Sequence, residues 1–424
     1  MNQFPLFKII LLTYLVVIGP AAAQEDDTTS SIPRKAKLFE PEGYGAVTKG
    51  GEGGQVIWVT SLAENGPGSL AAAFAAEGPR VIKFKVGGEI KLSKMLTLES
   101  AKRVTIDGLS AAPYGGITIT GGLQIAHGED IIVRHLRCRG GRNSLPTIHS
   151  RRVLIDHCSA AWAYDQVLDA WDSTDVTLQW CIIAEGLVDG GHEKGPHSCG
   201  SLQGGGATRV TTHHCLLTGS LDRNPLCAGP RLDDFEKRAP YRFDVVNNVV
   251  YNYWNASKTS SGSRVNFIAN YYRLGPDSSE SKPEIFLSPS NYGKPDYETK
   301  VHCAGNIGPH RTGTDLEEFG IVMILSEENL GGPKKHGFYG EGANRFLSRT
   351  PFPTPATAQV KVQTATAAYR DVLSYAGAWP RDEVDQRLIR EVRERQGAIG
   401  RVGPRWRQIH EEFQKKQAEE KKSP

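Results

Sequence analysis

The fold is decided by the stretch from Val153 to Pro225. It contains three similar segments, VLIDHCSAAWAYDQVLD (153–169), VTLQWCIIAEGL (176–187) and VTTHHCLLTGSLDRNP (210–225). In each, two or three apolar or β-branched residues precede a His or aromatic residue, a Cys, and further small or apolar residues. When the three segments are aligned on this pattern, one column contains His157, Trp180 and His214, and the next contains Cys158, Cys181 and Cys215.

The first column extends in both directions along the chain, to His135 on one side and to Asn248, Asn270 and Asn306 on the other. The intervals are 22 residues (135 to 157), 23 (157 to 180), 34 (180 to 214), 34 (214 to 248), 22 (248 to 270) and 36 (270 to 306). A base period near 22 with longer insertions is typical of a β-solenoid, in which each repeat forms one turn and insertions become loops on one face. The alternative, a β-sandwich of similar short strands, does not explain a register that survives six intervals.

The cysteines are interpreted as interior packing residues. Cys158, Cys181 and Cys215 recur beside the His/Asn column, where a small apolar side chain fits the inside of a solenoid. The chain has seven cysteines, so at least one is unpaired or pairs between molecules. Disulfides within the column are the less favoured alternative.

The chain is divided into five parts by composition. Residues 1–23 have an apolar run and Ala21-Ala22-Ala23, which predicts a secretory signal peptide, and 24–38 form a polar, disordered linker. Residues 39–350 form the all-β solenoid with an N-terminal cap, and 351–400 form a strap and a helix that starts near Pro380. Residues 401–424 are expected to be a solvated, charged tail.

The charge excludes one class of partner. The formal net charge is +3, and removal of Lys8 with the signal peptide leaves +2. Nucleic-acid binders concentrate much more basic charge, so nucleic acid is not expected as a partner. No second long apolar run follows the signal, so we also expect no membrane association, and we expect a secreted monomer, extracellular or periplasmic.

Acidic and amide residues recur at one position of the repeat. Asn143 and Asp165 each lie eight residues after their column residue, at 135 and 157, which places them one coil apart on the same rim. Asp169 adds a second carboxylate. An all-oxygen set of this kind favours Ca²⁺ or Mg²⁺. The alternative is that these residues only cap turns.

Two basic residues lie in the next two inserted loops. Lys194 and Arg223 should therefore project over the same face as the acidic set. Two cationic side chains beside a bound metal ion would be repelled by it, unless a polyanionic ligand lies between them. The alternative is that both are ordinary solvated surface charges.

These residues carry a resemblance. LIDHCS (154–159), the pair Asp165 and Asp169, HEKGPHS (192–198) and DRNP (222–225) together resemble the pectate lyases of polysaccharide lyase family one, secreted bacterial enzymes with a parallel β-helix. The likeness runs from EGYGAVTKGG to about Tyr272, and VLSYAGAWPRDEVDQRLI resembles the C-terminal helix of that family. The resemblance implies a right-handed, single-stranded parallel β-helix and calcium-assisted β-elimination on polygalacturonate or pectin.

The resemblance also implies roles for individual residues. Arg223 stands where the family has its proton-abstracting Arg, Lys194 where it has a catalytic and substrate-binding Lys, and Asp165 and Asp169 match two calcium ligands. His197 of the same motif is assigned to substrate binding. Two positions depart from the pattern. Asn143, the third calcium ligand, replaces an Asp, and Ala228 replaces an Arg. Arg231 is the candidate to replace that arginine in substrate binding.

Two other functions remain open from the residues alone. A polygalacturonase-like hydrolase uses a similar solenoid but needs paired carboxylates that activate water. A non-catalytic polyuronide-binding surface protein would bind the polymer and leave its length unchanged. An unsaturated product that absorbs ultraviolet light distinguishes the lyase from both.

Overall fold

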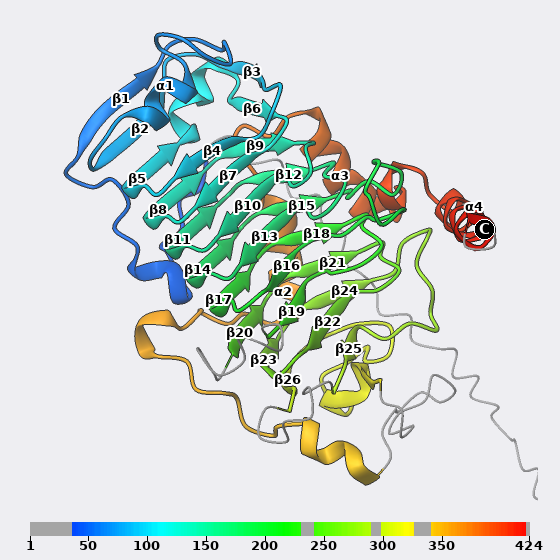
Figure 1. Cartoon of the computed structure of the whole chain (residues 1–424). Coiled ribbons are helices and arrows are strands. Elements are labelled where there is room, and N and C mark those ends of the chain that lie inside the picture. Colours follow the sequence, from blue (N-terminus) through cyan, green and yellow to red (C-terminus); the bar gives the residue numbers. More distant parts are fainter. Residues whose placement is uncertain (1–35, 230–240, 290–297, 326–340, 421–424) are drawn as a thin grey trace, which may run out of the picture.

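The computed structural model describes residues 36–229, 241–289, 298–325 and 341–420. Over these residues the chain winds as a parallel β-helix, with three parallel sheets that run along its length (Figure 1). Each coil gives one strand to each sheet in turn, here named sheets A, B and C. The predicted signal peptide at 1–23 and most of the linker lie outside the described residues. No described helix is long and apolar enough to cross a membrane.

Within the described ranges the strands fall into three sets. Sheet A consists of β1 (Gln55–Val59), β2 (Arg80–Phe84), β5 (Lys102–Asp107), β8 (Glu129–Arg134), β11 (Arg151–Asp156), β14 (Thr174–Gln179), β17 (Thr208–His213), β20 (Tyr241–Val246), β23 (Ser263–Ile268) and β26 (Lys300–Ala304). Sheet B consists of β3 (Gly88–Lys91), β6 (Ile117–Thr120), β9 (Leu136–Arg139), β12 (Ser159–Ala161), β15 (Ile182–Ala184), β18 (Leu216–Thr218), β21 (Val249–Tyr251) and β24 (Tyr271–Arg273). Sheet C consists of β4 (Leu96–Glu99), β7 (Leu123–Ala126), β10 (Leu145–Ile148), β13 (Leu168–Trp171), β16 (Leu202–Gly204), β19 (Leu226–Ala228), β22 (Ser257–Ser260), β25 (Ile285–Leu287) and β27 (Val322–Ile324).

The strands form because alternate residues are apolar and face the interior. In β11 and β14 the inward residues Val153, Ile155, Val176 and Leu178 are fully buried. Each coil stacks the same kind of side chain on the coil before it, so one continuous core runs along the solenoid. Cys158, Cys181 and Cys215 are fully buried, and all seven cysteines are free. The interpretation of the column cysteines as packing residues is confirmed.

The turn from sheet A to sheet B explains the aromatic column. His157, Trp180 and His214 each adopt a left-handed backbone with φ near 50°, which bends the chain sharply between two strands. Their rings stack from coil to coil, with centroids 6.0 Å apart for His157 and Trp180 and 4.3 Å for Trp180 and His214. The column therefore lies at a corner of the solenoid and not in a strand.

The predicted continuation of this column to the asparagines was wrong by one residue. His213 pairs with Val246 and Leu216 with Val249, so Asn247 follows His214 in the corner. Asn248 instead follows Cys215, whose N–H donates to Asn248 Oδ1 at 2.9 Å. From there an interior ladder runs, in which Asn248 donates to Asn270 at 3.0 Å and Asn270 to Asn306 at 2.9 Å. His214 and Asn247 are one residue closer in the sequence than Trp180 and His214 are. A column continued with equal spacing therefore passes the corner by one residue.

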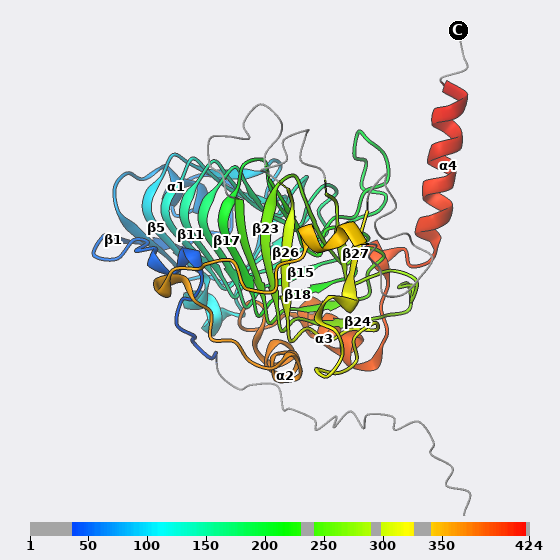
Figure 2. The same cartoon turned by 90° about the horizontal axis from the view of Figure 1, so that it is seen from below.

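Two of the three sheets are covered on their outer faces. The helices α2 (Ala365–Tyr375) and α3 (Glu383–Glu394) pack on sheet B through a shared apolar cluster. The strap that precedes α2 crosses sheet A, where Phe352 N–H donates to Asn266 Oδ1 at 2.9 Å, and Thr354 Oγ1 donates to Asp244 at 2.9 Å (Figure 2). The outer face of sheet C is bordered by the inserted loops that carry the predicted site.

Short helices complete the two ends. At the N-terminal end α1 (Leu70–Ala75) buries Leu70, Ala73 and Phe74 in the solenoid core, as expected of a cap. At the C-terminal end, the predicted charged tail contains a helix, α4 (Arg405–Glu420), which leaves the body of the molecule at a steep angle (Figure 2). The 3₁₀ helices are η1 (Tyr44–Val47), η2 (Gly108–Tyr114), η5 (Glu318–Ile321), η6 (Glu341–Phe346), η7 (Ala356–Ala358) and η8 (Ile399–Arg401).

Candidate active site

The loops from sheet B to sheet C gather the predicted site residues on one side of the solenoid. Asn143 precedes β10, Asp165 precedes β13, Lys194 and His197 precede β16, and Arg223 precedes β19. Asp169 lies within β13, between the inward residues Leu168 and Ala170, so its side chain faces outward. These strands are consecutive in sheet C. Arg231 lies outside the described residues.

The register of Asn143 differs from the prediction. Leu145 pairs with Leu168, 23 residues later, whereas His135 and His157 of the corner column are 22 residues apart. In agreement with this shift, Asp165 N–H donates to the carbonyl of Arg142. Asn143 is thus level with Gln166 and not with Asp165. The loop before β13 is one residue longer than the loop before β10, and loop lengths do not follow the period of the strands. Asn143 still reaches the site, because its Nδ2 donates to Asp169 Oδ2 at 2.6 Å.

Asp169 is a buried carboxylate whose negative charge is only partly compensated by its surroundings. Its side chain accepts hydrogen bonds from Leu202 N–H at 3.1 Å and from Asn143. Burial and the neighbouring Asp165 raise its pKa to about 7, although these hydrogen bonds and the charge of Arg223 act in the opposite direction. A nearby cation would stabilise the ionised form of this carboxyl group.

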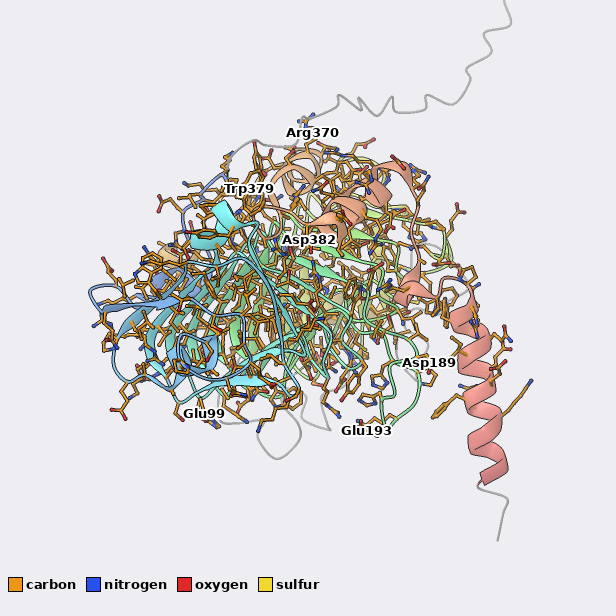
Figure 3. All side chains as sticks on the ribbon, turned by 90° about the horizontal axis from the view of Figure 1, so that it is seen from above. Glu99, Asp189, Glu193, Arg370, Trp379 and Asp382 are labelled. Atoms are coloured by element: carbon orange, nitrogen blue, oxygen red, sulfur yellow. The ribbon has the colours of Figure 1, made fainter. Side chains whose placement is uncertain are left out.

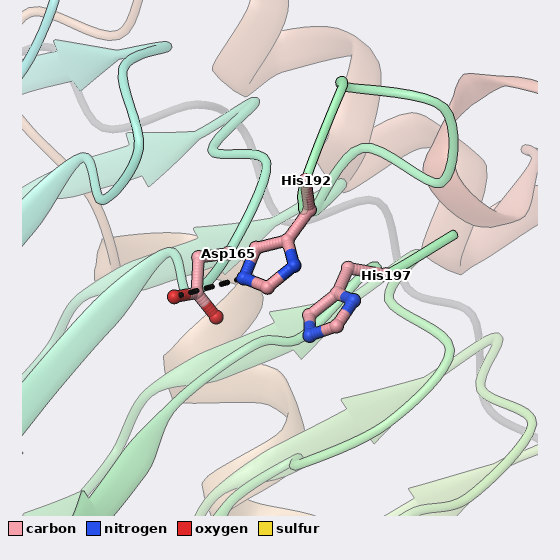
Figure 4. Close-up of side chains that lie close together, drawn as sticks. All are labelled: Asp165, His192 and His197. Atoms are coloured by element: carbon pink, nitrogen blue, oxygen red, sulfur yellow. Dashed lines mark ion pairs between the residues drawn. The ribbon is translucent and has the colours of Figure 1, made fainter. Parts of the chain in front are cut away.

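Asp165 belongs to a cluster with two stacked histidines. Its Oδ2 lies 3.3 Å from His192 Nε2, and the rings of His192 and His197 stack with centroids 3.6 Å apart (Figure 4). One donor atom of each residue lies within 4.8 Å of the others, close enough to hold a metal ion. However, Lys194 N–H donates to His192 Nδ1, so this ring nitrogen is already occupied by a hydrogen bond.

Arg142 also occupies this cluster. Its Nη2 lies 3.0 Å from Asp165 Oδ2 and 3.3 Å from His192 Nε2, where a cation would otherwise approach. The guanidinium also binds both carboxylate oxygens of Glu193 at 2.8 and 3.0 Å, which lowers the pKa of that carboxyl group to about 2. We therefore interpret this cluster as a hydrogen-bonded network that fixes the loop of Lys194.

The two basic candidates differ in their surroundings. Lys194 is exposed near the tip of its loop. Arg223 is partly buried, has a left-handed backbone with φ 62°, and its carbonyl accepts Ser201 N–H at 2.7 Å. Its Nε is buried and has no hydrogen-bond partner.

The sequence pattern did not indicate Arg142, His192 or Glu193 as site residues. A signal was available for His192 and Glu193, because both belong to the HEKGPHS motif. Arg142 has no such signal, since a single arginine after Gly-Gly is ordinary in a loop. Its role follows from the strand register that places it beside Asp165.

Curated relatives identify the family. A scan against models of known protein families finds no match. The chain is 31% identical over 374 residues to a protein of Aspergillus fumigatus named "Probable pectate lyase C", a match that covers 83% of this chain and 75% of that protein. It is 32% identical over 369 residues to the protein of the same name from Aspergillus terreus, with 83% and 76% covered.

Solved structures support the fold. A pectate lyase of a Bacillus species in complex with trigalacturonate has a TM-score of 0.51 and 16% identity, with 80% of this chain and 98% of that chain covered. A mutant of the Bacillus subtilis pectate lyase has a TM-score of 0.53 and 13% identity, with 83% and 100% covered. At these identities the likeness concerns the parallel β-helix alone. Together with the curated relatives, it shows that the chain belongs to the pectate lyase family of polysaccharide lyases.

Proposed function

We propose that this pectate lyase cleaves polygalacturonate by calcium-assisted β-elimination on the outer face of sheet C. The observation that carries the proposal is the arrangement around Asp169: a buried, outward-facing carboxylate that feels the charges of both Asp165 and Arg223. The trigalacturonate in the related Bacillus complex is consistent with this substrate.

Calcium would be held by Asp165 and Asp169, with the amide oxygen of Asn143 as a further donor. Two carboxylates and an amide are oxygen ligands of the kind that calcium prefers. The raised pKa of Asp169 supports the fit, because a bound cation would stabilise its ionised form. When bound, calcium would withdraw electron density from the C6 carboxylate of the substrate and acidify the C5 proton.

Arg223 is assigned the role of base. A neutral guanidine nitrogen takes the C5 proton, the electrons of the C5–H bond form a double bond between C4 and C5, and the C4–O bond breaks. The leaving oxygen takes up a proton, and no water is consumed. One sugar end is thus unsaturated, and the other is an ordinary reducing-end saccharide with a free anomeric centre.

Lys194 and His197 are assigned to substrate binding. The ammonium group of Lys194 can donate to a uronate carboxylate. His197 donates from Nδ1 to the carbonyl of Gly195 at 3.1 Å, which leaves Nε2 as an acceptor for a sugar hydroxyl. Arg231 remains a candidate for a further carboxylate. We also propose that the protein is secreted and acts as a monomer.

A base of this kind implies a preference for alkaline pH. Guanidinium groups in water lose their proton only above about pH 12, so the neutral fraction rises about tenfold per pH unit below that. Activity should therefore increase from neutral to alkaline pH. Full activity at mildly acidic pH would exclude Arg223 as the base.

The proposal is tested by ultraviolet absorbance on polygalacturonate, with calcium and with a chelator. Wild type should produce unsaturated ends only with calcium, and Arg223→Ala should lower the rate about 10²- to 10⁴-fold. Arg209→Ala is a matched control, because Arg209 pairs with Asp175 on sheet A, away from the site. New reducing ends without absorbance would indicate hydrolysis, and binding without any cleavage would indicate a binding protein.

A further inference from the structure

The C-terminal helix α4 packs against both loops that carry the proposed basic residues. Trp406, in its first turn, is only 8% exposed and belongs to an apolar cluster with Val188 and Leu221. Val188 lies six residues before Lys194, and Leu221 lies two residues before Arg223. Figure 3 shows α4 beside the labelled residue Asp189 of the first loop. One helix therefore contacts both loops at the site.

A second contact reaches the tip of the first loop. Gly195 directly follows Lys194, and a Cβ atom placed on it would lie 2.2 Å from Cζ and 2.3 Å from Cε1 of Phe413. The ring of Phe413 thus lies directly on the backbone of Gly195. The φ of Gly195 is 89°, a conformation that side-chain-bearing residues rarely adopt. Glycine is required at this position both by its backbone conformation and by the close approach of Phe413.

The base of the same loop is held independently. His192 and His197 stack on each other, Lys194 N–H donates to His192 at 3.0 Å, and His197 N–H donates to the carbonyl of Val188 at 3.0 Å. These contacts set the shape of the turn. Phe413 presses on its tip from outside, next to the residue whose ammonium group must reach the substrate.

We propose that Phe413 of α4 is a positioning residue, which holds the loop of Lys194 over the outer face of sheet C. The helix thereby makes the C-terminal segment a part of the substrate-binding machinery. This inference rests on the proposed role of Lys194 in binding polyuronate. It assigns a function to a segment that the sequence pattern indicates only as a charged tail.

The contact is tested in the full-length protein by limited trypsin digestion, because trypsin cleaves after lysine and Lys194 is exposed at the loop tip. The variants are Phe413→Ala and Phe413→Leu, with Glu411→Ala as the control on the same helix, since Glu411 is exposed. Mass spectrometry follows the peptide that ends at Lys194. We expect Phe413→Ala to accelerate this cleavage at least about tenfold, and Phe413→Leu and Glu411→Ala to remain close to wild type.

The same variants are assayed on polygalacturonate, with thermal unfolding as the check on folding. We expect Phe413→Ala to raise KM about tenfold at an unchanged kcat and an unchanged melting temperature, and Phe413→Leu to restore KM. Equal cleavage of all variants would overturn the inference. Faster cleavage with an unchanged KM would also overturn it, because the contact would then not serve substrate binding.

Lys194→Ala separates this inference from the proposed function. If Lys194→Ala keeps the wild-type KM, the role of Lys194 is wrong, and with it the purpose assigned to Phe413. The trypsin result still reports whether Phe413 holds the loop, because digestion requires no catalysis.

Discussion

Asp169→Asn should stabilise the protein at alkaline pH in the absence of calcium, because the buried carboxylate is costly to ionise. Burial and Asp165 raise the pKa of Asp169 from 3.8 to about 7 in the folded protein. Since one pKa unit corresponds to about 1.36 kcal/mol, a shift of about three units corresponds to about 4 kcal/mol. A raised pKa of an acid stabilises the folded state fully below the unfolded pKa, near pH 4, and this stabilisation is lost as pH rises through about 7.

At pH 8 without divalent cations, wild type therefore has an ionised and poorly compensated Asp169. Asparagine removes the charge, and its amide oxygen can still accept the Leu202 N–H. We expect Asp169→Asn to be more stable than wild type by up to about 4 kcal/mol at pH 8 and by less than about 1 kcal/mol at pH 4. With an unfolding entropy of about 2.1 cal/mol/K per residue, 4 kcal/mol corresponds to about 5 °C in melting temperature for a chain of 424 residues.

The assay is thermal unfolding by circular dichroism at pH 4 and pH 8, with a chelator and then with millimolar calcium. Calcium should raise the melting temperature of wild type at pH 8 and leave that of Asp169→Asn nearly unchanged. Asp189→Asn is the control, because Asp189 is exposed on the neighbouring loop. The same difference between variant and wild type at both pH values would refute the assignment of a destabilising charge to Asp169. An equal calcium shift in both proteins would refute its role as a ligand.

Two further predictions concern the scaffold. Asn248→Ala should lower the free energy of unfolding by at least about 3 kcal/mol. The side-chain amide of Asn248 forms hydrogen bonds with Cys215 N–H, the Thr212 carbonyl and Asn270 in the interior, and the substitution removes all of them. A loss below about 1 kcal/mol in denaturant titration would contradict the ladder. Asp385→Ala should cost about 3–5 kcal/mol, because Asp385 in α3 accepts a hydrogen bond from the buried Arg139 at 2.7 Å and its loss leaves this cation with only the more distant carboxylate of Asp382, at 3.5 Å. The double variant with Arg139→Met should recover much of that loss in the same titration, and no recovery would argue against a poorly paired charge as the cause.

Several features of the fold could be predicted from the residues. The recurring runs of apolar or β-branched residues at β11, β14 and β17 give parallel strands, because each coil repeats the residues that face the core. The stack of His157, Trp180 and His214 follows from the same repetition. The prediction lost register at Asn248 and at Asn143. In both places a loop changes length by one residue, and no periodic pattern records the length of a loop.

The site shows the same division. The sequence pattern indicates Asp165, Asp169 and Arg223 as site residues, and their strands are neighbours in sheet C. It does not indicate that His192 lies beside Asp165, or that Arg142 lies beside both. These contacts depend on how the loop folds back on itself. Such folding is set by a few hydrogen bonds and one ring stack and has no regular repeat.

The sequence by itself determined the period, the packing of cysteines inside the coils, and the chemistry of the residues at the rim. These properties are local or repeat with the coil, so neighbouring residues are enough to fix them. Only the tertiary structure decided which outer faces are covered, because α2, α3 and the strap cover sheets B and A through contacts with residues more than eighty positions away. It also placed Phe413 on Gly195, a contact between two segments separated by more than two hundred residues, which physical proximity in the folded chain alone creates.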